Sequence, residues 1–139
     1  MRFVIDASVA AKWFLPDEPY SAMALELLRS ATAGTTGFIV PDLFFSECGN
    51  ILWKATRHQR LTVGETRAAI RVIEDLQTVM VPAATLLEGI LQIAQSYDRT
   101  FYDSLYIVLP SNSRPIWSRR MRSSLMRRRR IFRSSGSAL

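Results

Sequence analysis

The chain has 139 residues, 48% of them hydrophobic, and a formal net charge of +6, which suits one domain with a buried core. No apolar run approaches the roughly 18–20 residues of a membrane-spanning helix, and Asp6 ends the first apolar run too early for a secretory signal. Cys48 is the single cysteine, so an internal disulfide is excluded and we expect a cytoplasmic protein.

The charge is divided unevenly along the chain. All acidic residues lie within 1–103, whereas 104–139 contain nine arginines and no acid. The basic character therefore belongs to the C-terminal part. The sequence predicts a folded domain over 1–110 and an Arg/Ser-rich tail over 111–139.

Short apolar strands alternate with longer helical patterns in the rest of the chain. Strands are predicted at 3–5, 38–40 and 78–81. Helices are predicted at 8–14, 20–32, 42–58, 62–76 and 85–97, and from about Thr100 onward. Their expected N-terminal caps are Ser8, Asp42, Thr62 and Thr85. This order predicts an α/β fold with a mainly parallel sheet, in which ligands gather at the carboxyl ends of the strands.

Three acids stand out, and each has a structural alternative. Asp6 follows the first strand, where it could also cap the next turn. Glu47 lies on a largely apolar helical stripe with no basic residue three or four positions away, which is costly for a buried carboxylate. Asp103 has a capping-box-like spacing from Thr100, with Arg99 four residues before it, so it could be an ordinary helix-start acid.

Together, Asp6, Glu47 and Asp103 predict a site for a hard cation. Carboxylates gathered at one corner repel one another unless a cation neutralises them, and oxygen ligands favour Mg²⁺ or Mn²⁺ over zinc. Such an ion binds phosphates and activates water, which is the chemistry of phosphodiester hydrolysis. A single histidine, His58, near a predicted helix end, excludes a two-histidine mechanism within one chain, and Cys48 is expected in the core.

Three segments match motifs of a known family. VIDASV at 4–9, followed by KWF at 12–14, resembles the opening of PIN-domain nucleases. PDLFFSECGNIL at 41–52 resembles the second motif, a helix with a catalytic Glu and an Asn one turn later. FYDSLY at 101–106 is similar to the third, a Tyr-Asp-x-x-Tyr segment. The three occur in the family's order and together cover about residues 1–110.

The closest subgroup is the toxin half of VapBC-type toxin–antitoxin modules. This resemblance implies an α/β/α sandwich, Mg²⁺- or Mn²⁺-dependent endoribonuclease activity on RNA, homodimerisation and inhibition by a cognate antitoxin. It assigns metal-ligand roles to Asp6, Glu47 and Asp103, and supporting roles to Ser8 and Asn50. Asn50 can equally be an ordinary polar helix residue.

The tail departs from this family. PIN domains usually carry a fourth acid after a further strand, and the corresponding position falls near Met121, in a segment that has no acid. We hypothesise a reading-frame shift between about Leu109 and Arg119, because codons for residues 119–122 read in another frame accommodate Ala-Asp-Glu. Two alternatives remain: a basic tail that binds RNA phosphates, and a solvated, partly disordered end.

Two other functions compete with the ribonuclease. One is a catalytically inactive PIN-like scaffold that binds antitoxin or RNA. The other is aspartyl-phosphate chemistry, which also begins with an Asp at a strand end. Phosphatases of that class need a second Asp at position 8, which is Ser, and receiver domains need an acid pair where Val4 and Ile5 stand.

Resequencing the gene tests the frame-shift hypothesis. We expect an inserted or deleted base between the codons for about Leu109 and Arg119, whose correction restores an acid near position 121. An intact open frame through Leu139, shared by close relatives, would contradict the hypothesis.

Overall fold

The computed structural model describes residues 1–109 and 114–115, and in this part of the chain the fold is α/β, as predicted. The central sheet has four parallel strands in the order β3-β2-β1-β4. The strands are β1 (Arg2–Val4), β2 (Gly37–Pro41), β3 (Thr78–Val81) and the short β4 (Arg114–Pro115).

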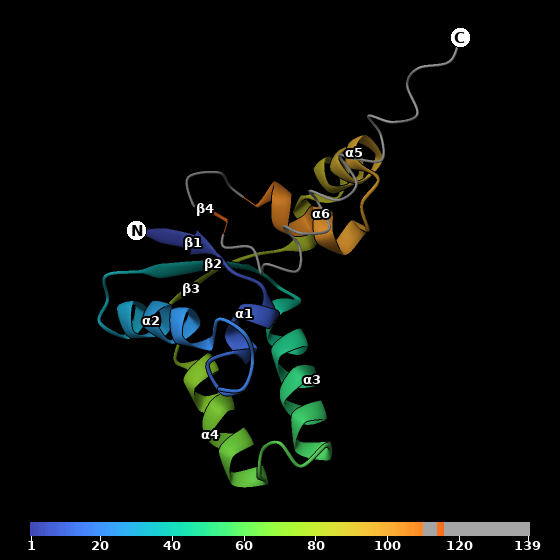
Figure 1. Cartoon of the computed structure of the whole chain (residues 1–139). Coiled ribbons are helices and arrows are strands. Elements are labelled where there is room, and N and C mark those ends of the chain that lie inside the picture. The colour runs from blue at the N-terminus through green and yellow to red at the C-terminus, as the bar shows by residue number, and fades with distance from the viewer. Residues whose placement is uncertain (110–113, 116–139) are drawn as a thin grey trace, which may run out of the picture.

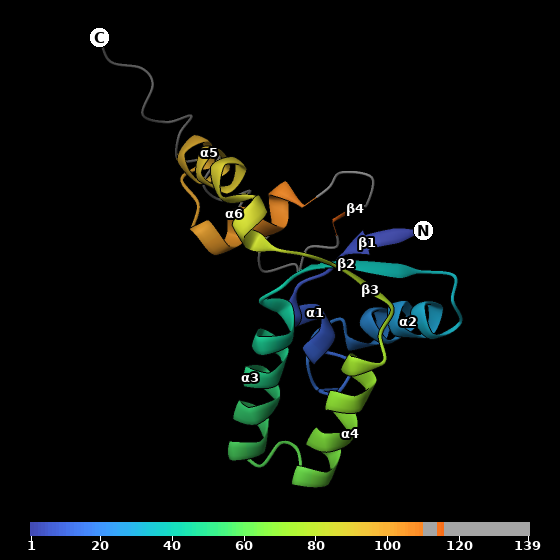
Figure 2. The ribbon, with the colours of Figure 1, turned by 180° about the vertical axis from the view of Figure 1, so that it is seen from behind.

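The described helices cover both faces of the sheet, which gives three layers (Figure 1). Helices α1 to α4 lie on one face, and α5 and α6 lie on the other, an arrangement that the view from behind also shows (Figure 2). The α-helices are α1 (Ala7–Ala11), α2 (Ser21–Thr32), α3 (Phe44–Arg57), α4 (Val63–Glu74), α5 (Leu87–Tyr97) and α6 (Phe101–Val108), with a 3₁₀ turn at Ala83–Thr85.

Alternation along the strands builds a hydrophobic core on each side of the sheet. Ile5, Phe38 and Val40 belong to the larger core, which also contains residues of α1 to α4. Val4 and Ile39 belong to the smaller core with residues from α6. Because successive strand side chains point to opposite faces, these short apolar runs can be buried on both sides at once.

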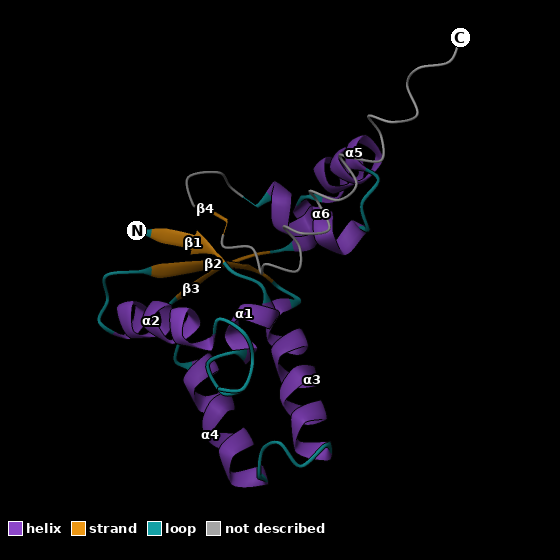
Figure 3. Cartoon of the chain, viewed as in Figure 1, coloured by secondary structure: helices purple, strands orange, loops and turns teal. Residues whose placement is uncertain are grey.

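The strand order places a change of direction at β1. The chain moves from β1 to β2 to β3 in one direction through α1 to α4, and then returns through α5 and α6 to β4 on the other side of β1. In open parallel sheets, the crevice beside such a reversal, at the carboxyl ends of the strands, is the usual ligand site. Figure 3 distinguishes the strands from the helices around them, and Asp6 comes two residues after the end of β1.

Two helix starts agree with their predicted caps. Thr62 and Glu65 form a complete capping box at the start of α4. The Thr100 hydroxyl accepts a hydrogen bond from the Asp103 backbone N–H at the start of α6.

Three predicted caps are wrong. Asp6, rather than Ser8, caps α1, because the chain turns directly after β1. Leu43 precedes α3, and Asp42 instead accepts a hydrogen bond from the Ala83 backbone N–H, which joins the ends of β2 and β3. Thr85 lies in the 3₁₀ turn, where its hydroxyl donates to the Pro82 carbonyl.

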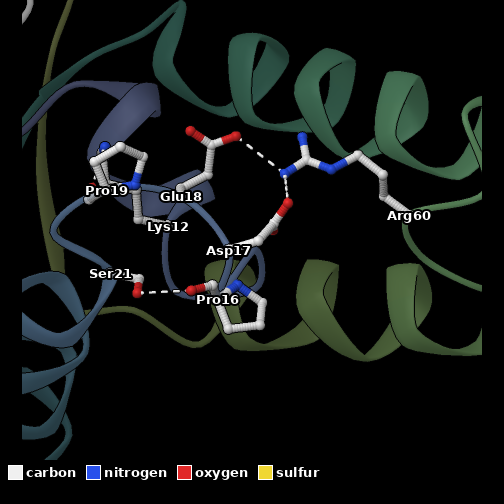
Figure 4. A network of polar contacts seen from close by, with 7 residues as sticks. All are labelled: Lys12, Pro16, Asp17, Glu18, Pro19, Ser21 and Arg60. Atoms are coloured by element: carbon white, nitrogen blue, oxygen red, sulfur yellow. Dashed lines mark hydrogen bonds and ion pairs between the residues drawn. The ribbon is translucent and has the colours of Figure 1, made fainter.

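An exposed ion-pair network fastens the loop between α1 and α2 to the turn after α3 (Figure 4). The Arg60 guanidinium lies 2.7 Å from an Asp17 carboxylate oxygen and 3.0 Å from one of Glu18. In the same loop, the Lys12 ammonium donates a 2.7 Å hydrogen bond to the Pro19 carbonyl. The positive charge of Arg60 is therefore neutralised by two carboxylates of the same fold.

The predicted division at residue 110 falls at the limit of the described structure. Apart from 114–115, the proposed tail and the position near Met121 lie outside the described residues. No helix in residues 1–109 or 114–115 is long and apolar enough to cross a membrane.

Two leucines at opposite extremes of burial test the assignment of the core. Leu52 is 1% exposed and Leu91 is 48% exposed. We expect Leu52→Ala to lower the free energy of unfolding by about 2–5 kcal/mol, because it leaves a cavity. Leu91→Ala should change it by less than about 1 kcal/mol. Urea denaturation measures both, and equal effects would contradict this core.

Candidate active site

Asp6 lies at the carboxyl edge of the sheet, where it has two roles in local structure. Its Oδ1 accepts a 2.9 Å hydrogen bond from the Val9 backbone N–H, which caps α1. The same oxygen accepts a 2.6 Å hydrogen bond from the Ser8 hydroxyl. In the described structure neither bond involves Oδ2, and Asp6 has no ion-pair partner.

Glu47 enters the same corner from the first turn of α3 and is partly buried. Its Oε2 accepts a 2.7 Å hydrogen bond from the hydroxyl of Tyr106 on α6. Tyr106 is 59 positions away from Glu47 in the sequence. The spacing of residues along α3 therefore gave no indication of this partner. The bond connects a helix of the larger core with a helix of the smaller one.

Burial and charge shift the acidity of this cluster. Burial raises the pKa of Glu47, the Tyr106 hydrogen bond lowers it, and the nearby Asp6 charge raises it, with a net upward shift. The pKa of the Tyr106 hydroxyl is strongly raised, first by burial and then by its bond to Glu47. Tyr106 therefore remains protonated and donates to Glu47.

Asp103 lies on α6 in its first turn, one turn before Tyr106. Residues three apart share a helix face, so Asp103 lies on the side of α6 that meets Glu47. Its backbone N–H donates to Thr100, and its carboxylate is partly exposed. Asp103 is therefore a helix-start acid, as its structural alternative predicted, on the same helix as Tyr106.

The three carboxylates do not form a closed metal-binding group in this structure. Across residues 1–109 and 114–115, no set of three His, Cys, Asp or Glu side chains is close enough to hold a metal ion. Asp6 and Glu47 are near enough for the charge of one to shift the pKa of the other. Asp6 and Glu47 are therefore coupled through charge, and Asp103 lies on a different helix, α6.

The other residues considered in the sequence fall at different distances from this pair. Ser8 contacts Asp6 directly, whereas Asn50 is exposed on α3 one turn after Glu47. Cys48 is buried in the larger core, as expected, and burial raises the pKa of its thiol to about 12, which disfavours the thiolate. His58 is the exposed residue at the C-terminal end of α3.

Comparison with known proteins adds no assignment. A scan against protein-family models finds no match for this chain, and neither does a search of curated proteins.

Tyr106 is the residue of this site whose role the sequence did not reveal. Its spacing from Asp103 was part of the third motif, but a tyrosine in an apolar helix is usually read as core. Two features of the sequence together could have indicated it: Glu47 has no basic residue three or four positions away, and the motif at 101–106 contains a tyrosine, Tyr106, whose hydroxyl can donate a hydrogen bond. A buried carboxylate requires a donor, and Tyr106 supplies one.

We expect Tyr106→Phe to raise the pKa of Glu47 further, because it removes the hydrogen bond that lowers it. The folded state favours the protonated carboxyl of Glu47, whose ordinary pKa is 4.5. The stabilisation that Glu47 contributes to the free energy of unfolding is therefore present below pH 4.5 and falls as the pH rises above that value. Titration of the side-chain carboxyl carbon by NMR measures the shift. Tyr102→Phe, on the same helix but 67% exposed, is the control and should leave the pKa unchanged; an unchanged pKa in Tyr106→Phe would contradict the assignment.

Proposed function

We propose that this chain is a metal-dependent endoribonuclease of the PIN type, from the toxin class of toxin–antitoxin modules. The observation that carries the proposal is the Asp6–Glu47 pair at the carboxyl edge beside the strand reversal. The three motif resemblances support it, because each motif carries one of the three acids: Asp6 caps α1, Glu47 lies in the first turn of α3 and Asp103 lies in the first turn of α6.

Two of the three proposed ligands, Asp6 and Glu47, suit Mg²⁺ or Mn²⁺ in the described structure. Asp6 and Glu47 offer carboxylate oxygens with no cationic partner in the described structure, and their mutual repulsion favours a cation between them. Asp103 is the third proposed ligand, and it would have to approach the other two for all three to hold one ion. When bound, such an ion neutralises charge on the attacked phosphodiester and activates water.

The chain's own side chains prepare this corner. Ser8 and the Val9 N–H hold Oδ1 of Asp6, which leaves Oδ2 for a ligand. Tyr106 holds Oε2 of Glu47 in the same way. Each carboxylate is therefore oriented by fixed donors on one oxygen, an arrangement that positions metal ligands in general.

We expect the chain to cleave single-stranded RNA weakly, because residues 104–139 contain no acid to serve as a fourth carboxylate. Cleavage should require Mn²⁺ or Mg²⁺, stop with a chelator, and fall at least about tenfold in Asp6→Asn, which keeps the shape of the side chain. Gel analysis of RNA fragments measures cleavage.

Direct Mn²⁺ binding, followed by electron paramagnetic resonance, supplies a readout that does not depend on cleavage. Wild type should bind Mn²⁺, and Asp6→Asn and Glu47→Gln should each bind it about 10–100-fold more weakly. Asp42→Asn is the matched control, since Asp42 is exposed and bonded to Ala83. Wild type that neither binds Mn²⁺ nor cleaves RNA would overturn the ribonuclease proposal.

The second candidate function is a catalytically inactive scaffold that binds an antitoxin or RNA. The absence of a three-carboxylate group in residues 1–109 and 114–115 favours it. Both candidates share the partners that we propose from the resemblance, namely RNA, a cognate antitoxin and a second copy of the chain. A small neighbouring gene that encodes a DNA-binding antitoxin would support this class, and Mn²⁺-dependent cleavage would separate the two candidates.

A further inference from the structure

Helix α3 forms an outer margin of the described structure. Its inner side packs against α1 and α4, and no labelled element lies beyond it in either view (Figures 1 and 2). Phe44, Cys48, Leu52 and Ala55 face the core. The opposite side of the helix is therefore open to a partner.

One flank of this open side carries polar and basic residues in a row that begins at Glu47. Three residues follow Glu47 along one stripe of the helix, at successive intervals of three, four and three positions: Asn50, Lys54 and Arg57. All three are exposed. At 1.5 Å per residue the row extends about 15 Å from Glu47.

Trp53 lies beside this row and is 58% exposed. An exposed tryptophan keeps a large apolar surface in water, and such residues are enriched where a protein binds a partner. The side chains of Trp53, Lys54 and Arg57 have no hydrogen bond or ion pair with other described residues.

Arg60, in the turn after α3, differs from Lys54 and Arg57 because it is ion-paired. It contacts two carboxylates, Asp17 and Glu18, so its charge is used within the fold (Figure 4). Within residues 1–109 and 114–115, Lys54 and Arg57 have no such neutralising partner. Their charge is available to an anion.

We propose that the row Asn50–Lys54–Arg57 with Trp53, here called the α3 track, binds single-stranded RNA. Lys54 and Arg57 contact backbone phosphates, and a base stacks on the indole of Trp53. The inference rests on the proposed function in one respect: the row starts at Glu47, so it holds the strand next to the phosphate to be cleaved.

Charge favours RNA over a second copy of the chain as the occupant. In a symmetric dimer through this face, the cations of one copy would approach those of the other, and like charges across an interface are unfavourable. A polyanion with aromatic bases matches both the charge of Lys54 and Arg57 and the flat surface of Trp53.

Lysine footprinting tests the track in the full chain. Lys12 and Lys54 are the only lysines, and Lys12 is bonded to Pro19 in a different loop. A short single-stranded RNA of mixed sequence is added with excess chelator, so that metal-dependent cleavage does not occur. Acetylation by a reactive ester, read by mass spectrometry, should slow at Lys54 by about fivefold or more and remain unchanged at Lys12.

Affinity measurements by fluorescence anisotropy give the second readout. Trp53→Ala should weaken RNA binding by about tenfold. The double variant Lys54→Ala/Arg57→Ala should reduce the slope of log affinity against log salt by about 1.4. The matched controls are Arg67→Ala/Arg71→Ala, which removes the same charge from exposed sites on α4, and Tyr97→Ala, which removes an exposed aromatic on α5. The arginine-rich tail is the same in every variant.

The outcomes separate this inference from the proposed function. Because the assay contains a chelator, protection of Lys54 supports the track even in a chain that proves unable to cleave RNA. A chain that cleaves RNA with Lys54 unprotected overturns the track alone. Equal losses in the α4 control, or a Trp53→Ala variant that changes oligomeric state without changing RNA binding, would likewise overturn it.

Discussion

The hydrogen bond from Tyr106 to Glu47 joins the two helical layers at the edge of the sheet where the site forms. Tyr106 belongs to the smaller core and Glu47 to a helix that packs in the larger one. The shared hydrogen bond connects α6 directly to α3, and Asp103 lies one turn before Tyr106 on α6.

The corner that holds Asp6 and Glu47 carries an electrostatic cost for the fold. Asp6 stabilises the start of α1 as its cap, yet its charge lies close enough to Glu47 to raise the pKa of that residue. Burial adds to this cost. Two carboxylates held near each other in a partly buried corner are unfavourable for stability, and such arrangements are characteristic of functional sites.

Sequence reasoning recovered the fold because its signals are local. The apolar run at 38–40 lies in a buried strand, the run at 78–81 forms a strand whose Val79 and Met80 are exposed, and Thr62–Glu65 forms the expected capping box. The predictions for Ser8, Asp42 and Thr85 were wrong, since the chain's route after β1, β2 and β3 decided which side chain reached a free N–H group. A capping motif reports a local preference, and tertiary contacts override it.

The sequence predicted one site for Asp6, Glu47 and Asp103, and that assignment stays a prediction. In the described structure the charge of Asp6 reaches Glu47, and the three carboxylates form no closed group. The distance of Asp103 from the other two depends on how α6 packs, for which sequence spacing carries no information. The same holds for Tyr106, whose contact with Glu47 spans 59 positions. By contrast, the shared exposed face of Asn50, Lys54 and Arg57 follows directly from helical periodicity once the buried side of α3 is known.

The central claim is that Asp6 and Glu47 together hold a divalent cation. Anomalous X-ray diffraction from crystals of the full chain grown with Mn²⁺ tests it most directly. The account predicts an anomalous peak in contact with carboxylate oxygens of both residues, on the side toward Asp103. A well-ordered site with no peak there, or a peak held by other residues, would contradict it.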